Sequence, residues 1–188
     1  GGTLLDPGLT DSVRERIRRG KHLVSDPRLA RLSPQEERVL EQIAEGKTNK
    51  DDYFGGAGYD SKSRPDLSNT AFFLDALQAA GVPKDDPAFK KALVFVSRCQ
   101  NIKGETNDQP WAGKINDGSF IYSAAAGGAV RNADGPAGDG SMPGYASMTY
   151  AGIKSMIYCG VSKDDPRVKK AFEWVSANYS LENNPGMP

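Results

Sequence analysis

Apolar residues recur every three or four positions in four segments of this chain, which is the spacing of helices that bury one face. The first segment, residues 66–81, predicts a helix that ends at Gly81, because glycine readily takes the left-handed conformation of a helix stop. The second, residues 86–98, opens with Asp86 as the N-cap and Pro87 in the first turn. The predicted apolar positions of these two helices are Phe72, Phe73, Ala76, Leu77, Ala80, Phe89, Leu93 and Val96. The pattern therefore predicts a helix, a tight turn and an antiparallel helix.

The same arrangement occurs a second time further along the chain. Residues 81–100 (GVPKDDPAFKKALVFVSRCQ) and 160–179 (GVSKDDPRVKKAFEWVSANY) agree at eleven of twenty positions without a gap. In the second copy Gly160 is the predicted stop and Asp165 the N-cap. Its apolar positions are Tyr150, Ile153, Met156, Ile157, Val168, Phe172 and Val175. The second Asp of each KDD is thus a predicted helix cap, rather than a catalytic acid or a metal ligand.

A connector rich in Gly, Ala, Asn and Asp, residues 101–143, separates the two helix pairs. Connectors of this length are uncommon in compact domains and are often functional or mobile. Within it, NDGSFIYS (residues 116–123) combines glycine, a small residue and an aromatic residue, as FGGAGYD (residues 54–60) does before the first pair. We call these two stretches the first (54–60) and second (116–123) Gly-aromatic segments. The predicted repeat unit is a Gly-aromatic segment, a loop, a helix, a turn and a helix.

These residues resemble the prenyltransferase and squalene-cyclase repeat family over about residues 52–187. The likeness is in the residues themselves as well as in the length of the repeat, for example in DQPWAGKINDGSFIY (108–122) and GYASMTYAGIKSMIYCGVSKDDP (144–166). The run from Gln100 or Gln109 to Phe120 is similar to the family's glutamine and aromatic motif, which ties a helix end to the next loop. The resemblance implies an all-α fold of the α/α toroid type, with helix pairs in an inner and an outer ring around an apolar cavity. Two pairs would form an incomplete barrel.

Four aromatic residues are the candidate ligand contacts, with packing inside a loop as the alternative for each: Tyr59, Trp111, Phe120 and Tyr122. In the family's cyclases such rings line the cavity and stabilise cations. The family's catalytic groups have no counterpart here. The strings nearest to the acidic DxDD motif, NKDD, PKDD and SKDD, lack the first Asp, and DDxxD is absent. The only histidine, His22, lies outside the repeats, so we expect no zinc set, no cofactor and no catalytic residue.

Residues 1–50 follow another pattern and resemble a fragment of a LuxR-type response regulator. LARLSPQEERVLEQIAEGKTNK (residues 29–50) looks like the opening of that family's DNA-binding domain, with Ser33 as N-cap and Glu36 completing a capping box. The recognition helix has no counterpart after Lys50, so we expect no specific nucleic-acid binding. We predict a helical domain at 1–50 and a repeat domain at 51–188. Two half-motifs meeting at residues 50–52 indicate a fusion, a chimera or an unnatural sequence.

Composition narrows the function classes only slightly. Lys plus Arg number 24 and so do Asp plus Glu, so the net charge of zero implies no polyanionic partner. No run approaches eighteen apolar residues, so no membrane span is expected. Two cysteines do not make a disulfide framework. No signal peptide is recognisable, which leaves the compartment open, with the cytoplasm as the default.

Three functional hypotheses follow. The first is a non-catalytic repeat module that binds an apolar ligand or a protein partner, with self-association into a homo-oligomer left open. The second is a fragment of an isoprenoid cyclase or prenyltransferase-type enzyme. The third, a DNA-binding regulator, depends only on residues 1–50.

Overall fold

The computed structural model describes residues 51–59, 63–79, 81–131 and 135–187. These residues form four α-helices and a few isolated β-bridges, with no strand among them, which confirms the all-α prediction. The helices are α3 (Leu67–Ala79), α4 (Pro87–Arg98), α5 (Ala146–Tyr158) and α6 (Pro166–Ala177). The predicted domain at residues 1–50, its regulator-like motif and Ala80 lie outside the described residues.

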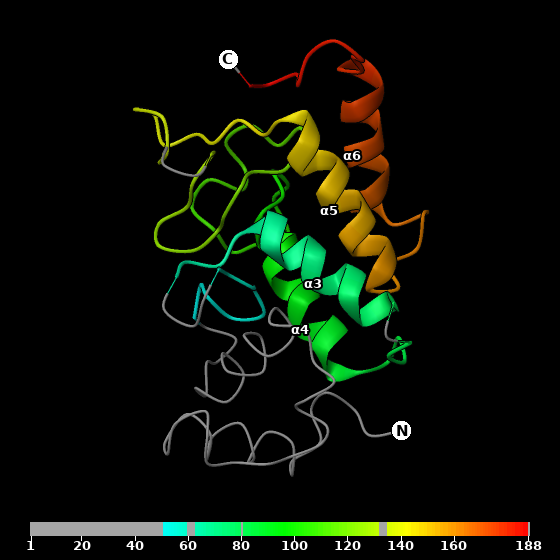
Figure 1. The fold of residues 1–188 in the computed structure, drawn as a ribbon. Coiled ribbons are helices and arrows are strands. Elements are labelled where there is room, and N and C mark those ends of the chain that lie inside the picture. Colours follow the sequence, from blue (N-terminus) through cyan, green and yellow to red (C-terminus); the bar gives the residue numbers. More distant parts are fainter. Residues whose placement is uncertain (1–50, 60–62, 80, 132–134, 188) are drawn as a thin grey trace.

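The four helices form two antiparallel pairs that lie side by side (Figure 1). Helix α3 packs on α4 and on α5, and α5 in turn packs on α6. The connector lies beside the amino-terminal ends of α3 and α5 (Figure 1). Helices α3 and α5, the first of each pair, therefore form the seam between the pairs.

The caps and stops of the helices are those predicted from the sequence. Oδ1 of Asp86 accepts a hydrogen bond from the backbone N–H of Ala88 at 2.8 Å, and Oδ1 of Asp165 accepts one from Arg167 at 2.9 Å. Gly81 and Gly160 have φ angles of +69° and +80°. These interactions involve only neighbouring residues, so the local sequence was sufficient to predict them.

Each Gly-aromatic segment is bonded to its own helix pair in the same way. The N–H of Ala57 donates to Oγ1 of Thr70 at 3.0 Å, and the N–H of Phe120 donates to Oγ1 of Thr149 at 3.1 Å. Both threonine hydroxyls then donate to the carbonyl oxygen four residues earlier, at 2.7 and 2.9 Å. The repeat seen in the sequence is therefore also a repeat of hydrogen bonds.

Large and small side chains change places between the two units. In the second unit the fully buried ring of Phe120 covers Gly152, where an added Cβ would lie 2.4 Å from a ring carbon. The equivalent residues of the first unit are Ala57 and Phe73, both buried. The ring thus comes from the Gly-aromatic segment in one unit and from the helix in the other.

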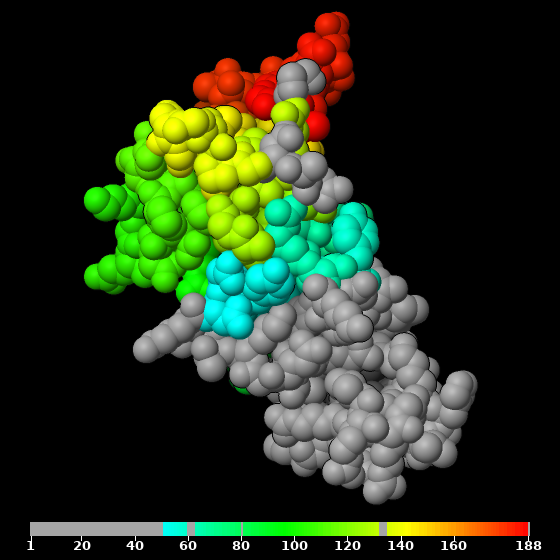
Figure 2. Space-filling model, turned by 90° about the vertical axis from the view of Figure 1, so that its left-hand side faces the viewer, coloured from blue at the N-terminus to red at the C-terminus, as the bar shows by residue number. Residues whose placement is uncertain are grey.

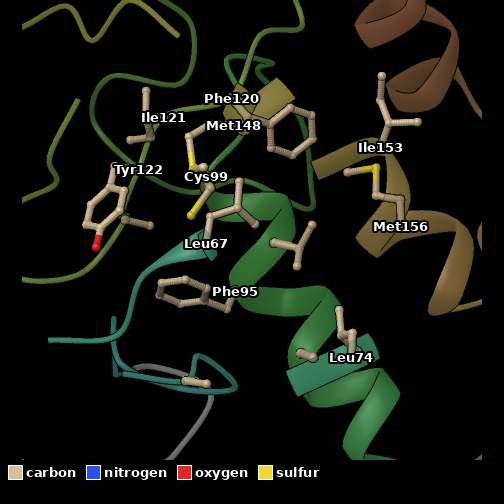
Figure 3. Packing of buried hydrophobic residues seen from close by; sticks show 14 of the residues in the cluster. Leu67, Leu74, Phe95, Cys99, Phe120, Ile121, Tyr122, Met148, Ile153 and Met156 are labelled. Atoms are coloured by element: carbon tan, nitrogen blue, oxygen red, sulfur yellow. The ribbon is translucent and has the colours of Figure 1, made fainter. Parts of the chain in front are cut away.

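The predicted apolar stripes were only partly correct. Seven of their members are buried: Phe73, Leu77, Phe89, Val96, Ile153, Met156 and Val168. Ala76, Leu93 and Val175 are half-buried, and Phe72, Tyr150, Ile157 and Phe172 are exposed. Other residues complete the core, among them Leu67, Leu74 and Phe95 (Figure 3). Helical spacing says which residues share a face, but contacts between helices decide which face is covered.

Candidate functional site

Two of the four predicted ligand contacts meet at one hollow, and two do not. Tyr59 and Tyr122 line an open hollow of about 530 Å³, where the first Gly-aromatic segment borders the connector. Figure 2 shows this border between the cyan and the green-to-yellow parts of the surface. The residues that line the hollow are Tyr59, Ser63, Arg64, Asp66, Tyr122 and Ala126.

Phe120 and Trp111 are core residues instead. The Phe120 ring is fully buried against α5, and Trp111, 4% exposed, packs in the connector near Gly128 and Met142. The indole N–H of Trp111 has no hydrogen-bond partner among the described residues. The packing alternative therefore describes these two residues, because a ring enclosed on all sides leaves no surface for a ligand.

Asp66 forms part of the hollow, although the sequence did not single it out. It precedes α3 and caps it: Oδ1 accepts from the N–H of Asn69 at 2.8 Å and Oδ2 from the Asn69 side-chain amide at 2.7 Å. The residue is only 1% exposed. Burial raises the pKa of Asp66 above its ordinary value, and the hydrogen bonds from Asn69 and Tyr122 oppose this only in part. The site therefore contains a carboxyl group that holds its proton more tightly than a surface aspartate.

Tyr122 connects Asp66 to the surface of the hollow. Its side chain lies at the edge of the core cluster with the hydroxyl directed away from the aliphatic residues (Figure 3). The hydroxyl interacts with the Asp66 carboxyl group and with Tyr59. Burial raises the pKa of Tyr122, and the charge of Asp66 and the hydrogen bond with Tyr59 add to the rise. Tyr59 is 58% exposed, so the three interacting side chains extend from solvent to a buried carboxyl group.

The second Gly-aromatic segment is held in place by Gln100 and not by Gln109. The Gln100 amide donates to the carbonyl oxygen of Gly118 at 3.1 Å and to that of Arg167 at 2.8 Å. Gln109 is bonded to the adjacent Asp108 instead. Gln100 thus joins the end of α4 to the segment that carries Tyr122 and to the first turn of α6.

The described residues offer no alternative centre for metal or thiol chemistry. They contain no group of three or more His, Cys, Asp or Glu side chains able to hold a metal ion. Cys99 and Cys159 are free thiols. Burial raises the pKa of both, that of Cys159 to about 12, so neither forms a thiolate readily.

Comparison with protein-family models, with curated proteins and with solved structures found no match to this chain. None of the helices in the described part of the chain is both long and apolar enough to cross a membrane. The functional argument therefore depends on the geometry of the hollow and of the repeat.

Proposed function

We propose that residues 51–188 form a non-catalytic helix-pair repeat module of the prenyltransferase and squalene-cyclase type, and that the module binds an apolar ligand at the Tyr59–Tyr122 hollow. The observation that carries this proposal is the meeting of these two tyrosines, which come from equivalent Gly-aromatic segments of different units. The exposed Tyr59 ring lies beside Tyr122, which in turn interacts with the buried Asp66 carboxyl.

The repeated hydrogen bonds support the toroid part of the proposal. Thr70 and Thr149 hold their segments in the same way, and Gln100 joins one unit to the next. Units that are joined by one repeated interface stack with a constant rotation, and this produces a curved array. The two helix pairs would form one arc of such an array.

The lining of the hollow sets the chemistry of the ligand. The ring of Tyr59 offers an exposed apolar face, and the Tyr122–Asp66 pair offers a hydrogen-bonding group at the base. Apolar pockets with a few polar groups orient ligands that have a hydrophobic body and one polar end. An isoprenoid alcohol has this form, because its hydroxyl can bond to Tyr122 while its chain covers Tyr59.

Titration of the protein with farnesol, followed by calorimetry, tests the proposal. Tyr59→Ala should weaken binding about tenfold or more, which corresponds to about 1.4 kcal/mol. Phe172→Ala is the matched control, because Phe172 is also an exposed aromatic residue, at 48%, but is not one of the residues that line the hollow. No binding by the unmodified protein, or equal losses in the two variants, would contradict the proposal.

Asp66 supports a second candidate, a fragment of an isoprenoid cyclase. A buried carboxyl group with a raised pKa stays protonated to higher pH, so Asp66, at the base of the same hollow, has a proton to donate. The same rise makes it a weaker acid, and an alkene is a poor base, so the binding module is the favoured function. Incubation with squalene and chromatography of the products tests this candidate. Cyclised product from the unmodified protein, lost in a folded Asp66→Asn variant, would favour the enzyme. Its absence would leave the binding module.

A further inference from the structure

The interface between the two helix pairs buries specific positions of the first pair. Ala71 on α3 is 5% exposed, and Gln100, just after α4, is fully buried. The side-chain amide of Gln100 donates to Gly118 and Arg167, which both belong to the second unit. The interface also includes an ion pair between Lys154 of α5 and Asp75 of α3 at 2.7 Å. The second pair thus covers one side of the first.

The same positions of the second pair are open. By the register of the repeat, the equivalents of Ala71 and Gln100 are Tyr150 and Tyr179. Tyr150 is 44% exposed and Tyr179 is 63% exposed. We call these two residues the acceptor face. These are large aromatic side chains, and exposed groups of such side chains mark surfaces where another protein binds.

The first pair exposes the complementary side. Phe72 of α3 is 61% exposed, whereas its equivalent Ala151 is half-buried and packs against the core cluster. We call the side of α3 that carries Phe72 the donor face. The first helix pair therefore exposes the donor face, which could pack on a preceding unit. The second pair exposes the acceptor face, on which a following unit could pack.

We propose that the acceptor face binds the donor face of a second copy of this chain, so that copies associate head to tail. The contact continues the interface already present between the two units, with α3 of one copy packed on α5 and α6 of another. It is heterologous, because each copy uses two different surfaces, and such contacts build chains or closed rings rather than stopping at a dimer.

The carboxyl-terminal tail competes with this contact. In the first unit the N–H of Leu67 donates to the carbonyl oxygen of Tyr122 at 2.7 Å. In the second unit the N–H of Ala146 donates in the same way to Pro185 of the tail at 2.8 Å. Asn184 holds the tail there by exchanging hydrogen bonds with Ser147 at 2.9 and 3.0 Å. A second copy displaces the tail and offers the carbonyl of Tyr59, the equivalent of Tyr122, in its place.

Sedimentation velocity of the full chain from about 1 μM to 1 mM tests the proposal. The average mass should rise with concentration, and Phe72→Glu and Tyr150→Glu should each reduce the rise. An equimolar mixture of these two variants should form dimers that grow no further, because each variant keeps one intact face. Asn184→Ala should increase association by releasing the tail, and adding Phe72→Glu to it should reverse the increase.

Ile157→Glu is the control on α5. Ile157 is 43% exposed, and its equivalent Gln78 stays exposed although the second unit covers the first, so the position lies outside the contact. Its association should match that of the unmodified chain. A monomer at every concentration in both the unmodified chain and Asn184→Ala would overturn the proposal. Association that Phe72→Glu leaves unchanged would also overturn the proposal. The same holds if the mixture of Phe72→Glu and Tyr150→Glu stays monomeric.

Discussion

Large and small residues are exchanged between the two units at positions 120 and 152. We therefore expect Phe120→Ala to destabilise the protein and Gly152→Phe to restore part of the lost stability. Phe120 is fully buried, and its ring occupies the space above Gly152. Removing such a ring costs about 3–5 kcal/mol, because apolar contacts are lost and a cavity remains. The free energy of unfolding of a whole domain is only about 5–15 kcal/mol, so Phe120→Ala should leave the protein close to unfolding.

The first unit suggests the repair. There the small residue, Ala57, is in the Gly-aromatic segment and the ring, Phe73, is on the helix. Gly152→Phe alone should overpack the site at a cost of about 1–3 kcal/mol or more, since even a Cβ at residue 152 would lie 2.4 Å from the Phe120 ring. Together with Phe120→Ala it reproduces the arrangement of the first unit. The double variant should therefore be more stable than Phe120→Ala, with a favourable coupling energy of about 0.5–3 kcal/mol.

Urea unfolding, followed by both circular dichroism and tryptophan fluorescence, measures these differences and shows whether unfolding is two-state. Phe172→Ala is the control, because its ring on α6 is 48% exposed, and we expect a change within about 0.5 kcal/mol. If the double variant lost the sum of the two single losses, residues 120 and 152 would not share one space. The repeat would then not extend to the packing of its side chains.

Two further predictions concern carboxyl groups. Asp86→Ala and Asp165→Ala should each cost about 0.5–2 kcal/mol in thermal melts, and the Asn variants much less, because Asn keeps the oxygen that accepts from the first turn; equal losses for Ala and Asn would argue against capping. Burial raises the pKa of Asp66 in the folded protein, so the folded state binds this proton more tightly than the unfolded state does. The resulting contribution to the free energy of unfolding is present in full below the pKa of the unfolded state, and it is lost as the pH rises through the pKa of the folded state. Asp66→Asn should therefore remove part of the fall in urea midpoint between about pH 4 and pH 7, and an unchanged pH profile would contradict the burial argument.

The candidate site at the hollow could be predicted only in part from the sequence. Tyr59 and Tyr122 were found because aromatic residues after glycine recur in both units. Asp66 was missed, although an Asp before an apolar helix is a common cap, because nothing in the sequence says that the cap faces Tyr122. Phe120 and Trp111 carry the same aromatic signal as the two tyrosines, yet they are enclosed in the core. A ring that contacts a ligand and a ring that packs under a loop have the same local sequence.

The local sequence by itself determined where the helices begin and end. Asp86, Asp165, Gly81 and Gly160 act on backbone groups within a few residues, so neighbouring residues contain all the information needed. Tertiary structure decided which helix faces are covered, which of the four aromatic residues reach the hollow, and that Tyr150 and Phe172 are exposed. Burial depends on residues that are distant in the chain, and no periodicity along one helix reveals which neighbour packs against it.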